Sequence, residues 1–283
     1  MREIEFIIDS RSGGKKIRDY LRGFGVSSSL LTALKKCENG ILLNGKHARS
    51  VDVLRDGDTL IISVPESGEP PKKNPDLPVK IAYEDEDVLV LEKPAFMPVH
   101  ESKNHRGDTL ANAAACHLDG GSFRAVFRLD RDTSGLVLIA KNELAASKLA
   151  GKVQKDYYAV CKGVLEGDGT VDAPVGRLTD SIIKRGVTDS GERAVTHYSA
   201  LKSYGDRTLV RLRLETGRTH QIRVHFSHIG HPLLGDTLYG EKSDEIDRQA
   251  LHCKTLYFTH PVTGENITVD CDFPADFKML LRE

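Results

Sequence analysis

Two short segments concentrate the side chains that could do chemistry. The first, Arg128-Leu-Asp-Arg-Asp-Thr-Ser-Gly135, places charged groups and a glycine directly before an apolar run. The second, Gly217-Arg-Thr-His-Gln-Ile-Arg-Val-His225, carries Arg218, His220 and Arg223 at the start of a predicted helix. Free N–H groups and a partial positive charge at a helix start, together with these donors, suit an anion: a phosphate, or a carboxylate from elsewhere in the chain.

Two more segments accompany them. Lys93-Pro-Ala-Phe-Met-Pro-Val-His100 predicts a stiff loop after a strand, because two prolines restrict the backbone. Lys155-Asp-Tyr-Tyr-Ala-Val-Cys-Lys-Gly163 brings a tyrosine pair into a strand, a pattern typical of core packing with the hydroxyl at the rim. We expect Thr219 to cap the helix that carries Arg223.

The four segments, in this order, resemble the signature segments of the RluA family of RNA pseudouridine synthases. Residues 1–65 resemble the alpha-L RNA-binding module often found at the N-terminus of these enzymes. The similarity runs from about residue 1 to residue 275, and four ordered segments are far more specific than any one of them. One position departs from the family pattern, since Phe127 stands where the family usually has a histidine.

The resemblance implies the isomerisation of uridine in RNA. The N1–C1′ bond breaks, the base turns, and C5 joins C1′, so the reaction needs no redox cofactor; the family implies no catalytic metal either. The chain agrees, because it has no glycine-rich phosphate loop and no cysteine ligand set. The sugar cannot be reached inside a stacked helix, so we expect the target nucleotide to be flipped out.

The resemblance also assigns roles to residues. Asp130 matches the essential carboxylate, which must be ionised to act as a nucleophile or as a base on the ribose. Arg223 is the expected partner that keeps it charged and orients it, with Arg218 second. Tyr157 matches the tyrosine that packs against the target base and assists removal of the C5 proton; Tyr158 is the competing assignment.

Cationic side chains predict where RNA binds. Residues 1–50 contain ten Lys and Arg against five Asp and Glu, although the whole chain has a net charge of −1. Charge alone fits either an RNA handle or a solvated basic face, and the resemblance implies the RNA handle. The expected RNA-binding residues are Arg128, Lys93, Arg218, His220, Lys15, Lys16, Arg18, Lys35 and Lys36. Family analogy favours ribosomal RNA over transfer RNA as the substrate.

The elements that must position these residues predict an α+β protein. Strands do not alternate regularly with helices, so a largely antiparallel mixed sheet with flanking helices is favoured over a doubly wound parallel sheet. The resemblance implies the pseudouridine synthase fold around an active-site cleft. Predicted strands are Val88–Leu91, Leu136–Ala140, Tyr157–Cys161, Leu209–Leu214 and Thr255–Phe258; predicted helices are Thr109–Cys116, Asn142–Lys152 and Gln221–Ile229.

Proline marks the expected domain boundary. Residues 65–78 contain five prolines and predict a semi-rigid linker, which gives an RNA-binding module over 1–65, a linker over 66–78 and a catalytic domain over 79–283. In the module, a serine before Leu30 caps a second helix, Ile41–Leu43 forms a strand, and Asn44-Gly45 is a strong tight-turn signal. A short helix is also expected after the glycine pair at 13–14.

Composition excludes several classes of protein. The 283 residues contain no apolar run of the roughly 20 residues that a membrane span needs. The N-terminus has neither a signal peptide nor a transit peptide pattern. Five scattered cysteines without a C-x-x-C argue against a disulfide framework and favour a reducing cytoplasm. We expect a monomer.

Three alternatives remain. Asp132-Thr-Ser-Gly135 superficially resembles the aspartic protease loop, but no second copy exists to supply the paired carboxylate. The histidines His220, His225, His228 and His231 suggest a metal site, yet no acidic partner lies among them before Asp236. The third is a non-catalytic RNA-binding or ribosome-assembly protein on the same fold, for which Phe127 is the one hint.

Overall fold

The N-terminal unit, residues 2–64, is a small sheet covered by two helices. The computed structural model describes residues 1–66, 68–118, 120–178, 181 and 183–282, so Ser67 of the predicted linker and the terminal Glu283 lie outside the described residues. The elements of the unit are β1 (Arg2–Ile7), α1 (Ile17–Phe24), α2 (Ser28–Lys36), β2 (Ile41–Leu43), β3 (Lys46–His47) and β4 (Thr59–Val64). The strands pair antiparallel in the order β1-β4-β2-β3.

Local signals account for much of this unit. Ser27 caps α2, because its hydroxyl accepts a hydrogen bond from the Leu30 N–H at 3.1 Å. Asn44 and Gly45 both have positive φ, 49° and 74°, as the tight turn between β2 and β3 requires. Apolar side chains from both helices and the sheet are fully buried together and form a core of their own.

The rest of the chain is built on a ten-stranded sheet. Its strands are β5 (Lys80–Glu84), β6 (Val88–Lys93), β7 (Arg124–Ala125), β8 (Ser134–Ala140), β9 (Gln154–Lys162), β10 (Asp168–Asp172), β13 (Val195–Tyr204), β14 (Arg207–Leu214), β15 (Leu251–Thr259) and β16 (Asn266–Asp270). The order is β10-β13-β14-β9-β15-β8-β6-β5, with β16 beside β15 and β7 beside β8. Among the described strands only β8 and β15 pair in parallel, which confirms the predicted α+β class with a largely antiparallel sheet.

Short helices flank this sheet. They are α3 (Leu110–Ala114) with a 3₁₀ turn over Ala115–His117, α4 (Glu143–Leu149), α5 (Gln221–His228) and α6 (Ala275–Met279), and β11 (Val175–Arg177) pairs with β12 (Arg185–Val187) as a separate hairpin. Asn142 caps α4 as predicted, since its side chain accepts from the Ala145 N–H at 2.9 Å. The five sequence-predicted strands and three predicted helices all correspond to elements of the structure.

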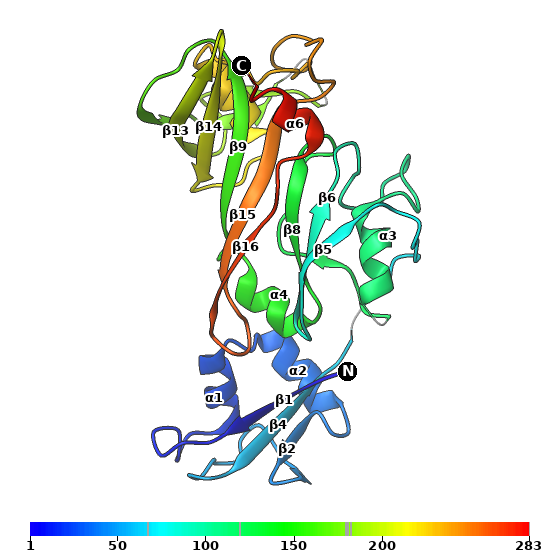
Figure 1. The fold of residues 1–283 in the computed structure, drawn as a ribbon. Helices are drawn as coiled ribbons and strands as arrows, with labels where there is room; N and C mark the ends of the chain where they lie inside the picture. The colour runs from blue at the N-terminus through cyan, green and yellow to red at the C-terminus, as the bar shows by residue number, and fades with distance from the viewer. Residues whose placement is uncertain (67, 119, 179–180, 182, 283) are drawn as a thin grey trace.

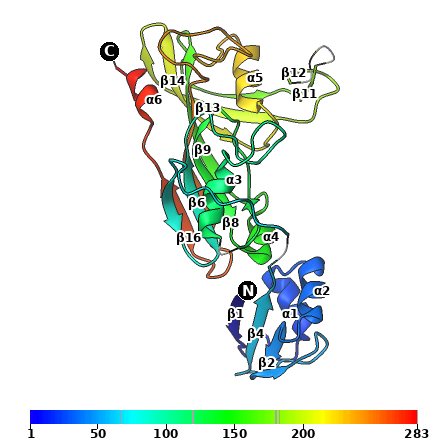
Figure 2. The same ribbon diagram turned by 90° about the vertical axis from the view of Figure 1, so that its right-hand side faces the viewer.

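The molecule is elongated, with the N-terminal unit at one end. Figure 1 shows this unit below the large sheet, next to α4, and Figure 2 shows α5 and the β11–β12 hairpin at the opposite end. The core strand β8 is buried along its whole length and joins the two regions, because it begins near the 128–133 loop and leads into α4.

Candidate active site

The loop that carries Asp130 is held from both sides. Leu129, 7% exposed, anchors the loop in the main core, and the Thr133 N–H donates to the Asp130 carbonyl at 3.2 Å. The Thr133 hydroxyl accepts a hydrogen bond from Gln249 Nε2 at 3.1 Å. Asp130 is therefore fixed by its backbone while a quarter of its side chain stays exposed.

The start of α5 is organised by Gln221, which sequence reasoning missed. Its Oε1 accepts from the Arg218 N–H at 3.0 Å, and its Nε2 donates to the Val195 carbonyl at 2.9 Å. The predicted cap at Thr219 is wrong: the N-cap is His220, whose backbone is left-handed with φ of 59° and whose side chain makes no capping hydrogen bond. The glutamine side chain closes this turn from within the helix, so a hydroxyl cap is not needed.

Arg223 lies between two carboxylates. Its Nε and Nη2 donate to the two oxygens of Asp236 at 2.7 and 2.8 Å, and its Nη1 donates to Asp130 Oδ2 at 3.2 Å. Burial lowers the pKa of Arg223, but the hydrogen bond to Asp236 and the charges of both carboxylates outweigh burial and raise it. The helix start thus meets carboxylates from elsewhere in the chain, one of the two anions that the sequence suggested.

Asp236 is the second residue that sequence reasoning did not assign to the site. It is 1% exposed, and its Oδ1 also accepts from the Leu238 and Tyr239 N–H groups at 3.1 and 3.2 Å. A fork-to-fork contact fixes the plane of the guanidinium, so Asp236 aims the remaining nitrogen of Arg223 at Asp130. The only sequence signal was its place as the first carboxylate after the histidine run.

His220 and Tyr239 form the wall beside this ion pair. The His220 Nδ1 lies 2.8 Å from the Tyr239 hydroxyl, and its Nε2 lies 3.8 Å from Asp130 Oδ2. The Tyr239 hydroxyl also accepts from the Arg185 N–H at 2.9 Å, and its ring lies 5.1 Å from the Arg223 guanidinium. Burial lowers the pKa of His220, so the imidazole is neutral at neutral pH.

Strand alternation separates the two tyrosines of β9. Tyr157 is 6% exposed, belongs to the main core and lines the pocket with Asp130. Tyr158 points to the other face and packs edge-on against Phe273, with ring centroids 5.3 Å apart. Burial is the main reason that the pKa of Tyr157 lies well above that of a free phenol. Tyr157 is therefore the tyrosine at the pocket.

Six of the predicted site residues line one pocket; they are Asp130, Tyr157, Arg223, Arg128, Arg218 and His220. Arg218 does not reach Asp130, because its guanidinium pairs with Glu192 and donates to the Arg193 carbonyl at 3.2 Å. Of the two arginines considered as partners, Arg223 makes the contact. Arg128 is exposed at the rim.

The structure argues against an RNA contact by Lys93. Its side chain is 1% exposed, and its Nζ donates to three main-chain carbonyls, those of Pro94, Met97 and Arg131, at 2.8–2.9 Å. Burial lowers its pKa to about 7, against the attraction of the Asp132 and Asp130 carboxylates. With its three donors occupied, Lys93 ties the 94–97 loop to the loop that carries Asp130.

The remaining predicted RNA-binding residues are all exposed and belong to the N-terminal unit, at the far end of the molecule from the pocket. They are Lys15, Lys16, Arg18, Lys35 and Lys36. Phe127, the departure from the family pattern, packs against the main core with the Lys155 ammonium 4.7 Å from its ring centroid. It contributes to the packing of the main core.

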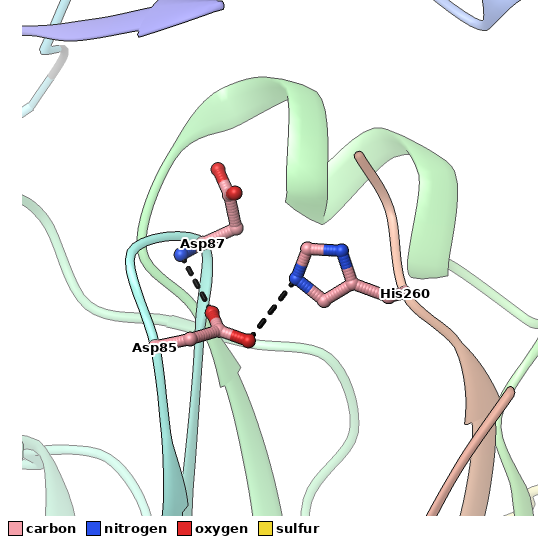
Figure 3. A group of neighbouring side chains, drawn as sticks. All are labelled: Asp85, Asp87 and His260. Carbon is pink, nitrogen blue, oxygen red and sulfur yellow. Dashed lines mark hydrogen bonds and ion pairs between the residues drawn. The ribbon is translucent and has the colours of Figure 1, made fainter. Parts of the chain in front are cut away.

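One group in the described part of the chain could bring three metal-ligand atoms together: Asp85, Asp87 and His260 (Figure 3). Protein donors already occupy it. The His260 Nδ1 accepts from the Val262 and Thr263 N–H groups at 3.3 and 3.0 Å, so in the neutral ring Nε2 carries the proton and faces Asp85 at 3.1 Å. A metal at Nε2 would need the opposite tautomer, so we interpret the group as a structural brace.

Three of the four histidines of the sequence segment contact protein groups, and the first of them is His220, described above. His225 is fully buried and contacts the Thr196 hydroxyl and the Ala173 carbonyl, both at 2.9 Å, while His231 contacts the Lys162 carbonyl at 2.9 Å.

In the described residues, no helix is both long and apolar enough to cross a membrane.

Comparison with known proteins gives one consistent result. The family model described as RNA pseudouridylate synthase matches residues 87–228. The uncharacterized RNA pseudouridine synthase YjbO of Bacillus subtilis is 44% identical over 278 residues, which cover 94% of this chain and 98% of that protein. The ribosomal large subunit pseudouridine synthase D of Pseudomonas aeruginosa is 38% identical over 264 residues, with 85% and 82% covered. The solved structure of human RNA pseudouridylate synthase domain containing 1 matches with a TM-score of 0.58 at 29% identity, covering 69% of this chain and 84% of that one.

Proposed function

The chain belongs to the RNA pseudouridylate synthase family, and from this premise we propose that it isomerises uridine in ribosomal RNA with Asp130 as the reacting carboxylate. The ion pair of Asp130 with Arg223 in a pocket that also contains Tyr157 carries the assignment. A relative of 38% identity bears the name ribosomal large subunit pseudouridine synthase D, which favours ribosomal over transfer RNA.

Asp130 acts while ionised, either as the nucleophile at C1′ or as a base on the ribose. The Arg223 guanidinium lies 3.2 Å from the carboxylate and orients it toward the pocket. The N1–C1′ bond breaks with its electrons going to the base, while Asp130 either bonds to C1′ or takes a proton from the ribose. The base turns and C5 bonds to C1′, and Asp130 leaves C1′ or returns the proton. The C5 proton then leaves and N1 gains one, so the reaction balances without a cofactor.

Tyr157 forms the apolar floor against which the base packs. Its raised pKa keeps the phenol protonated near neutral pH, so it presents a ring face and a hydroxyl rather than a phenolate. Tyr157 lines the pocket with Asp130, and we propose that it assists the loss of the C5 proton.

The exposed cations hold the RNA around a flipped uridine. Arg128 and Arg218 stand at the rim of the pocket, where they meet phosphates next to the target or fill the space that the base leaves. His220 completes the wall. The N-terminal unit supplies affinity through its exposed lysines and arginines. We further propose that the enzyme works as a monomer in the cytoplasm.

Tritium release from RNA labelled at uridine C5 tests the assignment. We expect Asp130→Asn to fold normally and to release no tritium above background, because an amide can act neither as nucleophile nor as base and the nearby Asp236 is buried. Asp132→Asn is the matched control: Asp132 lies two residues away and pairs with Arg131 at 2.6 Å. Wild-type release by Asp130→Asn, or an equal loss in both variants, would remove Asp130 from the mechanism.

A further inference from the structure

The N-terminal unit is bound to the large sheet by a paired arginine. The Arg2 guanidinium donates to both oxygens of Asp87 at 3.1 Å and lies 2.9 Å from Glu86. Asp87 is 2% exposed and also accepts from Asn142 Nδ2 at 2.8 Å. Asn142 caps α4. The buried Asp87 carboxylate therefore links β1 of the N-terminal unit to α4 of the large unit.

The same junction is apolar at its centre. Leu144 of α4 is fully buried, and its side chain belongs to the core of the N-terminal unit rather than to the main core. Val262 packs against that core from the β15–β16 turn. The Lys148 ammonium lies 3.6 Å from the ring centroid of Phe24. Small polar interfaces between domains usually permit relative motion. Here Leu144 of the large unit is packed inside the core of the N-terminal unit, which opposes such motion.

The β5–β6 turn, which carries Asp87, is held in place by hydrogen bonds. Asp85, two residues earlier, accepts hydrogen bonds from the Asp87 N–H and the Tyr83 hydroxyl at 2.8 and 2.7 Å. It also faces His260, as Figure 3 shows, which ties the β5–β6 turn to the β15–β16 turn. Both turns therefore present a braced surface to the N-terminal unit.

The connecting segment is also pinned. The Asn112 side chain, fully buried, donates to the Lys72 carbonyl at 2.8 Å. The Asn74 N–H donates to the Asn112 carbonyl at 3.1 Å, and Asn74 Nδ2 donates to the Gly107 carbonyl at 2.7 Å. The described residues of this segment thus follow the body of the molecule and leave the N-terminal unit little freedom to swing.

We propose that the N-terminal unit is docked in one position and acts as a ruler, so that the enzyme selects a uridine at a set distance from an RNA element held by the unit. The inference rests on the proposed function. Asp130 and α4 stand at opposite ends of β8, whose seven residues span about 20 Å. A substrate must reach across at least that distance to touch both the cations of the unit and the pocket.

Docking is tested first, without RNA. In the double variant Arg2→Ala, Leu144→Ser both contacts are lost, while α4 keeps Ala145 and Leu149 in the main core. We expect small-angle scattering to show a larger radius of gyration and thermal unfolding to split into two transitions. The control Arg282→Ala, Leu201→Ser makes the same substitutions at exposed positions of the large unit, away from the junction, and should match the wild type. An expanded wild type overturns docking.

Selection is tested next on a large-subunit ribosomal RNA transcript, with pseudouridines mapped by carbodiimide stops. At saturating enzyme we expect the opened variant to modify the wild-type sites about tenfold more slowly, because the target is no longer presented at a fixed place. A short hairpin with only the modified uridine should react equally with all three proteins. Equal rates on the long transcript, despite an opened molecule, overturn the ruler. If neither the wild type nor the variants modify the transcript, both the proposed function and the distance selection are wrong. Docking of the N-terminal unit is then decided by the scattering result alone.

Discussion

At the scale of single residues, the geometry of the pocket depends on Arg223, which bonds to both Asp236 and Asp130 but more closely to Asp236. Arg223 gives two short hydrogen bonds to the buried Asp236 and one longer bond to the partly exposed Asp130. We therefore propose that Asp236 acts as a positioning residue: it orients Arg223, and Arg223 orients Asp130, the carboxylate proposed to react. The motif resemblance located Asp130 and Arg223, but nothing in the local sequence around Asp236 indicates which side chain it contacts.

Asp236→Asn should separate chemistry from binding. The amide keeps the shape but loses the charge and one acceptor, so Arg223 is no longer held in its plane. Small displacements of a reacting group can cost about 100-fold in rate, so we expect kcat to fall by up to about that factor with RNA affinity unchanged. Asp270→Asn is the control, because Asp270 is paired with Lys254 and accepts from the Thr255 hydroxyl, and neither partner lines the pocket. Single-turnover tritium release gives the rate; a wild-type rate in Asp236→Asn would exclude the positioning role.

At the scale of elements, prediction succeeded where the signal is local. The hairpin at Asn44-Gly45, the caps of Ser27 and Asn142, and the strand over Ile41–Leu43 depend on neighbouring residues and are confirmed. The start of α5 was predicted wrongly at Thr219, because the side chain of Gln221 reaches back from inside the helix. Pairing of distant strands has no local signature, so the parallel contact of β8 with β15 was not foreseen.

That parallel contact predicts the consequence of one substitution. Gly135 of β8 has φ of 120°, and a Cβ there would lie 2.2 Å from the Cys253 carbonyl oxygen of β15. We expect Gly135→Ala to lower the free energy of unfolding by about 1–3 kcal/mol, and to slow the reaction because the Asp130 loop leads into this strand. Gly205→Ala, at φ of 64° with nothing near its Cβ, measures the backbone cost alone. Urea titration compares them; equal losses would contradict the close approach.

At the scale of the whole molecule, charge is divided between two ends. The N-terminal unit bears exposed lysines and arginines, whereas the pocket at the far end contains buried pairs. The excess of Lys and Arg in residues 1–50 predicts the positive charge of the N-terminal unit. The sequence does not predict how the N-terminal unit is attached to the large sheet, because Leu144 belongs to α4 of the large unit but packs in the core of the N-terminal unit.

This division predicts how salt acts on RNA binding. Each phosphate contact that is lost reduces the slope of log affinity against log salt by about 0.7–0.9. Replacing Lys15, Lys16 and Lys36 together by alanine should lower the slope accordingly and leave kcat at saturating RNA unchanged. The control removes Lys80, Lys162 and Lys278, which are paired with carboxylates. Filter binding across a salt series gives the slope, and an unchanged slope in the first variant would deny these residues a role in binding.

The seclusion of Arg223 has a consequence for an enzyme whose substrate carries a negative charge at every nucleotide. A side chain with only 9% of its surface open, already committed to two acids, cannot be captured by a stray backbone phosphate. We therefore expect salt and polyanionic inhibitors to change the fraction of the enzyme that is bound to RNA and to leave the turnover of the bound enzyme unchanged.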